Sequence, residues 1–319
     1  MQLAPIVLFT YNRPDHTRRT LDSLKANLLA DQSELYIFCD GPKEGTSQAD
    51  IERIKAVRAL IREENWTRKI YIKEAETNKG LARSIIDGVT EVVEQQGRVI
   101  VLEDDLELSP GFLKYMNDAL EFYNDEERVM HISGFMFPVK TELPETFFYK
   151  FTTCSGGWAT WSRAWKHLNS DPLSLYKKLL DTDQLHRFNL EGSSDQALQL
   201  YSNIDGNLNT WAIKWYATVF LQNGLCLHPC KSLTRNIGFD ELSSNTKTGT
   251  ELLDIKEVSE AINVYKIDLE ESETAREAYK AMFMDSRGSK IKQFLYKNYS
   301  SSILIRLFFR YFIKINKLF

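Results

Sequence analysis

Short, nearly continuous apolar runs alternate with helical periodicities through the first hundred residues. Each apolar run predicts a strand. The runs cover residues 5–10, 35–39, 69–73 and 98–102. Between them, apolar residues recur every three or four positions and predict amphipathic helices. These helices cover residues 15–29, 48–64 and 80–95. Strands that are apolar throughout and alternate with helices are typical of an α/β fold whose sheet is covered on both faces and at least partly parallel.

Beyond residue 110 the pattern becomes less regular. The spacing predicts a helix over residues 111–123, then aromatic-rich sequence up to Trp165 and an apolar stretch over residues 211–227. Residues 251–282 are rich in charge and predict a further helix. At 319 residues the chain is long enough for one large domain or two smaller ones.

Polar residues directly follow three of the predicted strands. They are Thr10–Arg13, Asp40 and Glu103–Asp105. In α/β sheets, ligands bind outside the carboxyl ends of the strands. We therefore expect these three groups to converge on one edge of the sheet.

Glu103, Asp104 and Asp105 place three consecutive carboxylates after a buried strand. Neighbouring carboxylates repel each other and are costly without a counter-charge. A hard divalent cation such as Mn²⁺ or Mg²⁺ prefers oxygen ligands and neutralises the charge that builds on a departing nucleotide diphosphate. The alternative is a solvated acidic turn. The position after an apolar strand, beside two other polar strand ends, favours the metal site.

Asn78, Lys79 and Gly80 precede a helix that carries Arg83 in its first turn. A glycine permits close backbone approach, and a helix start supplies donors for anionic oxygens, so this loop is a candidate nucleotide contact. The alternative is a plain turn before a helix. The loop has neither the GxGxxG nor the Walker A pattern, which argues against a dehydrogenase or a P-loop protein.

The ends of the first two strands supply further candidate nucleotide-sugar contacts. Asp40 either accepts hydrogen bonds from a base or ribose or simply favours the turn formed with Gly41. Arg13 has the charge to pair with a phosphate, although arginine is also common in surface turns. Thr10 and Tyr11 complete the set at the end of the first strand.

Two candidates lie in the second half of the chain. Gly157 and Trp158 combine a flexible backbone position with an aromatic ring, which suggests close approach to a ligand and an apolar platform for a sugar. Asp195 is a candidate general base, because an acceptor hydroxyl must lose its proton as it attacks the anomeric carbon. The alternative for Asp195 is the N-cap or first turn of a helix.

Charge is distributed unevenly along the chain. The formal net charge is −4, yet residues 289–319 contain seven basic and no acidic residues, so the rest carries about −11. An acidic body argues against nucleic acid as a partner. In a helical tail, Arg306, Arg310, Lys314 and Lys317 would fall on one stripe with apolar residues covering much of the rest. That pattern predicts a helix lying on anionic lipid, with packing against the catalytic domain or a partner as the alternative.

Several features concern the cellular compartment. The four cysteines show no disulfide framework, and no charged segment precedes the first apolar run as it would in a signal peptide. No uncharged apolar run approaches the ~18–20 residues that span a bilayer. We therefore predict a cytoplasmic protein that associates peripherally with the inner face of the membrane through residues 289–319.

These motifs resemble family 2 glycosyltransferases and their relatives with the GT-A fold. The segments that resemble the family's nucleotide site are Pro5–Pro14, Asp40, Asn78–Gly80 and Val99–Phe112. The Glu-Asp-Asp triplet and Gly157-Trp158 also resemble the N-glycan branching N-acetylglucosaminyltransferases. Trp211–Trp215 and Ser232–Asp240 are similar to a bacterial branch associated with surface polysaccharides.

The resemblance implies a role for each carboxylate of the triplet: Asp105 would bind the metal, and Glu103 and Asp104 would face the nucleoside. It also implies a Rossmann-like mixed sheet flanked by helices and inversion at the anomeric carbon. The branching enzymes carry carboxylates after a tryptophan, but here Ala212 and Ile213 follow Trp211, so we assign the base to Asp195.

We therefore expect a GT-A catalytic domain over residues 1–250. Residues 1–106 would form its nucleotide-sugar half and residues 107–250 its acceptor half, followed by a helical linker over 251–288 and the basic helical tail over 289–319. The predicted reaction moves a sugar from a nucleotide diphosphate, UDP in our interpretation, to a glycan or lipid-linked acceptor. The alternatives are a sugar nucleotidyltransferase and a non-catalytic nucleotide-sugar-binding scaffold.

Overall fold

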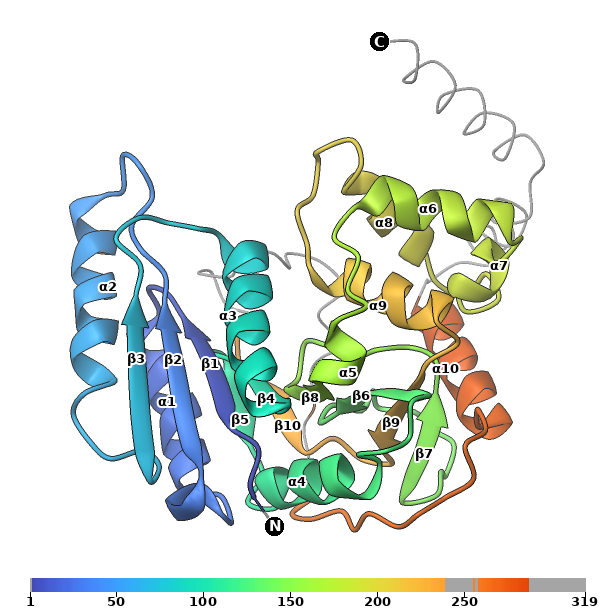
Figure 1. Cartoon of the computed structure of the whole chain (residues 1–319), viewed down its shortest axis with the longest axis horizontal. Coiled ribbons are helices and arrows are strands. Elements are labelled where there is room, and N and C mark those ends of the chain that lie inside the picture. The colour runs from blue at the N-terminus through green and yellow to red at the C-terminus, as the bar shows by residue number, and fades with distance from the viewer. Residues whose placement is uncertain (1, 239–254, 256–257, 287–319) are drawn as a thin grey trace.

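A computed structural model describes residues 2–238, 255 and 258–286. Within these residues, eight strands form one mixed sheet in the order β3-β2-β1-β4-β8-β6-β9-β7 (Figure 1). The strands are β1 (Ile6–Thr10), β2 (Glu34–Cys39), β3 (Lys69–Glu74), β4 (Arg98–Glu103), β6 (Val129–Ser133), β7 (Thr146–Tyr149), β8 (Trp158–Trp161) and β9 (Leu225–Pro229). The three pairs from β3 to β4 are parallel, whereas β8 is antiparallel to both of its neighbours. A separate antiparallel ribbon pairs β5 (Leu106–Leu108) with β10 (Thr234–Asn236).

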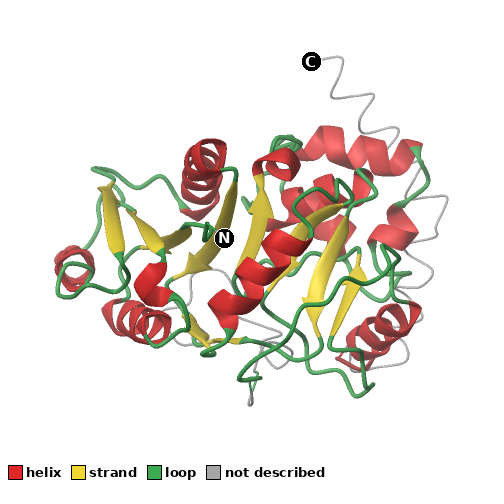
Figure 2. Ribbon diagram, turned by 60° about the horizontal axis from the view of Figure 1, so that its bottom comes forward, coloured by secondary structure: helices red, strands yellow, loops and turns green. Residues whose placement is uncertain are grey.

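Helices cover both faces of the sheet (Figure 2). One face packs against α1 (Pro14–Lys25), α2 (Gln48–Leu60) and α4 (Phe112–Phe122), and the other against α3 (Leu81–Gln96), α5 (Ser162–Trp165) and α9 (Ala212–Leu221). The alternation of side chains along a strand divides β1 between the two layers. Leu8 belongs to the first core, and Val7 and Phe9 belong to the second. This arrangement confirms the predicted mixed sheet flanked by helices.

A third, aromatic-rich core lies beyond the last strands of the sheet. It is enclosed by α6 (Pro172–Asp181), α7 (Leu185–Phe188), α8 (Gln196–Ser202), α10 (Glu273–Ser286) and one face of α9. Phe188 and Tyr216 stack there with ring centroids 4.5 Å apart. The buried His228 lies between two aromatic partners: its ring stacks on Phe147, and its Nδ1 lies 3.3 Å from the hydroxyl of Tyr279 on α10. Aromatic rings from β7, β9, α7, α9 and α10 thus pack together in this core.

The strands predicted for the first hundred residues agree with the structure to within one residue at each end. Two helices end earlier than predicted: α1 ends at Lys25 and α2 ends at Leu60. After α1 the chain turns through a 3₁₀ helix at Ala30–Gln32, preceded by Leu29 in the left-handed region with φ 73°. A residue in the left-handed region cannot belong to a right-handed helix, so Leu29 lies outside α1.

The helix predicted over residues 251–282 is wrong for much of its length. Among its described residues, those from 258 to 272 do not form a helix, and α10 begins only at Glu273. Ile262 and Val264 are buried while Asn263 and Tyr265 are exposed, so burial alternates with period two and the segment packs as extended chain. Nor is α10 a free linker, because Ala275, Tyr279 and Met282 are buried in the aromatic core.

The basic tail predicted over residues 289–319 lies outside the described residues. Among the residues that are described, none forms a helix long and apolar enough to cross a bilayer. All four cysteines are free thiols.

Candidate functional site

The order of the parallel strands reverses at β1. Its neighbours are β2 on one side and β4 on the other, so β1 and β4 flank the point where a doubly wound sheet binds its ligand, outside the carboxyl ends of the strands. Residues 11–13 follow β1, and the three carboxylates Glu103–Asp105 end β4 and follow it. Asp40 follows β2, which is parallel to β1 and ends in register with it, so topology places all three predicted groups along this edge.

Arg13 joins these two strand ends. Its Nη2 lies 2.7 Å from Asp104 Oδ1 and 2.9 Å from Asp105 Oδ2. The backbone N–H of Tyr11 donates to the other oxygen of Asp104 over 3.3 Å. These charge-assisted bonds compensate for the burial of Asp104, which is 5% exposed. Arg13 was expected to meet a phosphate, and in this structure it meets the acidic triplet.

The acidic triplet sets three neighbouring carboxyl groups against one cationic partner among the described residues. Burial, and then the charges of Asp105 and Asp104, raise the pKa of Glu103 to about 8. Burial also raises the pKa of Asp104, with Arg13 opposing the rise. Arg13 is the only cation that forms an ion pair with these carboxylates among the described residues. Three close carboxyl groups with a single cationic partner fit a hard divalent cation, which would favour their ionised forms.

The described part of the chain does not supply a complete coordination sphere at this position. Residues 2–238, 255 and 258–286 contain no group of three or more His, Cys, Asp or Glu side chains arranged to hold a metal ion. A cation bound by Asp105 could take further oxygen ligands from substrate or water, as Mg²⁺ sites commonly do.

Asp40 ties the loop after β2 to the loop after β3. Its carboxylate accepts hydrogen bonds from the backbone N–H groups of Gly41 (2.8 Å), Lys79 (2.8 Å) and Gly80 (3.0 Å) and from Asn78 Nδ2 (2.9 Å). Gly80 adopts φ 78° immediately before α3, a conformation that favours glycine. The structure thus brings Asp40 together with all three residues of the predicted Asn-Lys-Gly loop, and Asp40 fixes the backbone of that loop.

The remaining candidates near these loops lie in different environments. The Thr10 side chain is buried and its hydroxyl donates to Cys39 Sγ over 3.2 Å. Burial raises the pKa of the partly buried Tyr11 phenol, with smaller contributions from Asp50 and Asp40. Arg83 is exposed on α3 and pairs with Asp87 one turn further along. Whether these side chains contact a nucleotide stays a prediction.

Gly157 and Trp158 play different structural roles. Gly157 has φ 74°, and a Cβ there would lie 2.9 Å from Phe112 Cζ, so both backbone conformation and space require glycine. The Trp158 ring is 1% exposed and stacks on Trp211 with centroids 5.1 Å apart. The expected exposed platform for a sugar is therefore wrong for this ring, because β8 turns it into the core between the sheet and α9.

Asp195 is exposed and directly precedes α8. It occupies the N-cap position, where its backbone C=O accepts hydrogen bonds from the N–H groups of Leu198 and Gln199, but its side chain forms no cap bond. Helix α8 belongs to the helical layer around the aromatic core, and the acidic triplet lies at the end of β4. Its assignment as general base stays a prediction.

One contact was missing from the sequence interpretation. The segment after β10 closes against the triplet: the N–H of Ile237 donates to the Asp105 C=O over 2.8 Å, and His16 Nε2 lies 3.1 Å from the Ile237 C=O. A Cβ on Gly238 would lie 2.3 Å from Asp105 Oδ2 and 2.8 Å from Arg13 Nη1. Asn236, Ile237 and Gly238 belong to the segment that resembles the surface-polysaccharide branch, but no local sequence pattern indicates that they pack on residues more than a hundred positions earlier.

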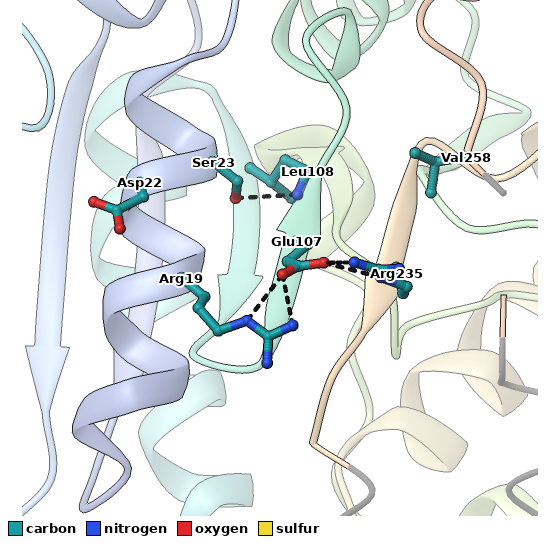
Figure 3. A pocket seen from close by; sticks show the side chains of 7 residues that line it. All are labelled: Arg19, Asp22, Ser23, Glu107, Leu108, Arg235 and Val258. Carbon is teal, nitrogen blue, oxygen red and sulfur yellow. Dashed lines mark hydrogen bonds and ion pairs between the residues drawn. The ribbon is translucent and has the colours of Figure 1, made fainter. Parts of the chain in front are cut away.

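A pocket of about 410 Å³ lies between α1, β5 and β10 (Figure 3). At its centre Glu107 accepts hydrogen bonds from Arg19 through Oε1 and from Arg235 through Oε2. These three charges are already paired with one another. The pocket thus offers a ligand less unbalanced charge than the triplet at the end of β4, and we do not assign the chemistry to it.

Comparison with models of protein families gives one match. Residues 6–136 match the model of glycosyl transferase family 2. This match covers about two fifths of the chain, from β1 through β6, and contains Arg13, Asp40 and the acidic triplet. It does not extend to Gly157, Trp158 or Asp195. Comparison with curated proteins found no match.

Solved structures show only distant similarity. TarS from S. aureus is 17% identical, with 45% of this chain and 23% of TarS covered and a TM-score of 0.30. Mouse xyloside xylosyltransferase 1 is 13% identical over 68% of this chain and 81% of its own, with a TM-score of 0.35. A UDP-glucose pyrophosphorylase in complex with UDP-glucose is 11% identical over 71% and 90%, with a TM-score of 0.33. At these scores the similarities carry no argument about function.

Proposed function

We propose that this chain is a metal-dependent, inverting glycosyltransferase that uses a nucleotide diphosphate-sugar, with UDP as the nucleotide. The observation that carries the proposal is the acidic triplet at the strand-order reversal, joined to the end of β1 through Arg13. The family 2 match over residues 6–136 includes both strand ends and supports the same assignment. The proposed acceptor is a glycan or lipid-linked acceptor in surface polysaccharide biosynthesis.

The residues divide into donor binding and proton transfer. Asp105 would hold Mn²⁺ or Mg²⁺, which when bound supplies positive charge for the departing nucleotide diphosphate. Glu103 and Asp104 face the nucleoside, and the loop fixed by Asp40 lies beside them along the same edge of the sheet. Asp195 accepts the proton of the acceptor hydroxyl as the oxygen attacks the anomeric carbon and the bond to the diphosphate breaks. One displacement of this kind inverts the anomeric centre.

We assign donor binding to residues 1–106 and acceptor binding to residues 107–250. Thr10, Tyr11, Asn78, Lys79, Gly80, Arg83 and the backbone at Gly157 and Trp158 complete the proposed donor site. The basic tail over residues 289–319 is proposed to hold the protein at the cytoplasmic face of an anionic membrane.

The proposal is tested with Asp105→Ala and a panel of nucleotide sugars. We expect wild-type protein to hydrolyse or transfer at least one donor in the presence of Mn²⁺, and Asp105→Ala to lose that activity while circular dichroism shows a folded protein. Asp22→Ala, which removes an exposed carboxylate of α1, is the matched control and keeps activity. Full activity in Asp105→Ala would refute the metal assignment.

Two further measurements separate the alternatives. A sugar nucleotidyltransferase would release pyrophosphate from a nucleoside triphosphate and a sugar 1-phosphate. A scaffold would bind a nucleotide sugar in calorimetry and release it unchanged.

A further inference from the structure

Arg13 occupies the position of a counter-cation between two carboxylates. A single nitrogen, Nη2, contacts both Asp104 and Asp105, and the side chains of all three residues are at most 15% exposed. The base of the arginine is also fixed, because the N–H and hydroxyl of Thr17 both donate to the Arg13 C=O, over 2.9 and 2.8 Å. The guanidinium is thus held across the gap between the ends of β1 and β4 by its backbone and by its partners.

The surroundings leave little freedom on the outer side of this ion pair. Gly238 lies against both Asp105 Oδ2 and Arg13 Nη1, so that even a methyl group there would force these side chains to shift. The adjacent Ile237 is fixed at both backbone groups, by Asp105 and by His16. Asp105 Oδ2 therefore faces the guanidinium on one side and the backbone of residues 237–238 on the other.

A divalent cation and a guanidinium are poor neighbours on one carboxylate. Two cations a few ångströms apart repel each other, and the repulsion is stronger in a partly buried site than in water. A cation that binds Asp105 thus has to displace Arg13 from Oδ2 or bind against its charge. A nucleotide diphosphate removes this conflict, because its oxygens ligate the cation and also accept charge-assisted hydrogen bonds from the arginine.

We propose that Arg13 is a resident counter-cation that excludes divalent cations from Asp105 until a diphosphate arrives and draws the guanidinium away. The assignment of Asp105 as metal ligand rests on the proposed function. Arg13 is then a positioning residue that makes cation and nucleotide diphosphate bind together. Bare Mn²⁺ binds weakly, UDP raises its affinity, and the coupling passes through the Arg13 side chain.

The test measures Mn²⁺ binding to the full chain by electron paramagnetic resonance of the free ion, with and without UDP. Arg13→Met keeps the apolar stem and removes the charge, and we expect it to bind Mn²⁺ without UDP roughly tenfold to a hundredfold more tightly than wild type. The gain on adding UDP should shrink by a comparable factor. Arg19→Met removes a neighbouring α1 arginine that pairs with Glu107, and it should behave as wild type. The double variant Arg13→Met/Asp105→Ala should lose the added Mn²⁺ affinity.

An Arg13→Met protein that binds Mn²⁺ no more tightly than wild type overturns the inference. Should that variant not fold, Arg13→Lys carries the test: an ammonium bridges the two carboxylates less well, so the affinity for Mn²⁺ alone should still rise several-fold, and wild-type affinity would overturn the inference. The binding assay needs no turnover. Tighter Mn²⁺ binding without transfer of any sugar upholds the role of Arg13 and refutes the transferase. Sugar transfer by wild type, with no gain in Mn²⁺ affinity in Arg13→Met, upholds the transferase and refutes the role of Arg13.

Discussion

Replacing Asp40 by alanine removes four hydrogen bonds at once. The carboxylate accepts three backbone N–H groups and one side-chain amide at 2.8–3.0 Å, and these bonds fix the loop that begins α3. A hydrogen bond to a charged group contributes about 1.5–3 kcal/mol. Because Asp40 is only partly buried, water replaces some of these partners, and we expect Asp40→Ala to lower the free energy of unfolding by roughly 2–4 kcal/mol.

The measurement is urea unfolding followed by tryptophan fluorescence. Asp40→Asn is a stringent companion, since its NH₂ group would face donors on Asn78 or the loop backbone, and we expect a loss of similar size. The control is Asp87→Ala, which removes an exposed α3 carboxylate paired with Arg83 at 3.5 Å and should change stability by less than ~0.5 kcal/mol. An Asp40→Ala protein as stable as this control would show that the four bonds do not hold the loop.

Three further predictions concern single positions. Gly157→Ala combines a positive φ with a clash against Phe112 and should lower the free energy of unfolding, measured by thermal unfolding, by about 2–4 kcal/mol. Gly97→Ala, at φ 78° with open space around it, should lower it by only ~1 kcal/mol, and equal losses would contradict the clash. Burial lowers the pKa of His228 from 6.5 to about 4, so the unfolded chain takes up a proton at higher pH than the folded protein does. The free energy of unfolding should therefore fall by roughly 3 kcal/mol as the pH falls from 6.5 toward 4. His228→Phe should flatten this pH dependence, and an equally steep dependence in the variant would be contrary evidence. Asp195→Asn should keep UDP affinity in calorimetry and lower kcat about 10²–10⁴-fold, and unchanged kcat would move the base elsewhere.

The sequence alone determined the secondary structure of the first hundred residues, apart from the ends of two helices. Continuous apolar runs with helical spacing between them located β1 through β4 and their helices, because these patterns are set by neighbours in the chain. The family 2 match over residues 6–136 covers this same region. The sequence pattern also placed polar groups at the carboxyl ends of three strands, which lie at one edge of the sheet because parallel strands share a direction. Helix ends were less accurate: α1 ends four residues before the predicted Leu29, and Leu29 itself takes a left-handed conformation that no glycine signals.

Only the tertiary structure decided what each side chain meets. The charge of Arg13 suggested a contact with phosphate, but in the folded protein its guanidinium pairs with Asp104 and Asp105. The sequence suggested Trp158 as an apolar platform for a sugar, but its side chain lies on the face of β8 that is buried in the core. Gly238 contacts Asp105 across more than a hundred residues. Local periodicity records which face of an element is apolar, but it does not record which distant segment covers that face. The acidic triplet was therefore visible in the sequence, and its counter-cation and its cover were not.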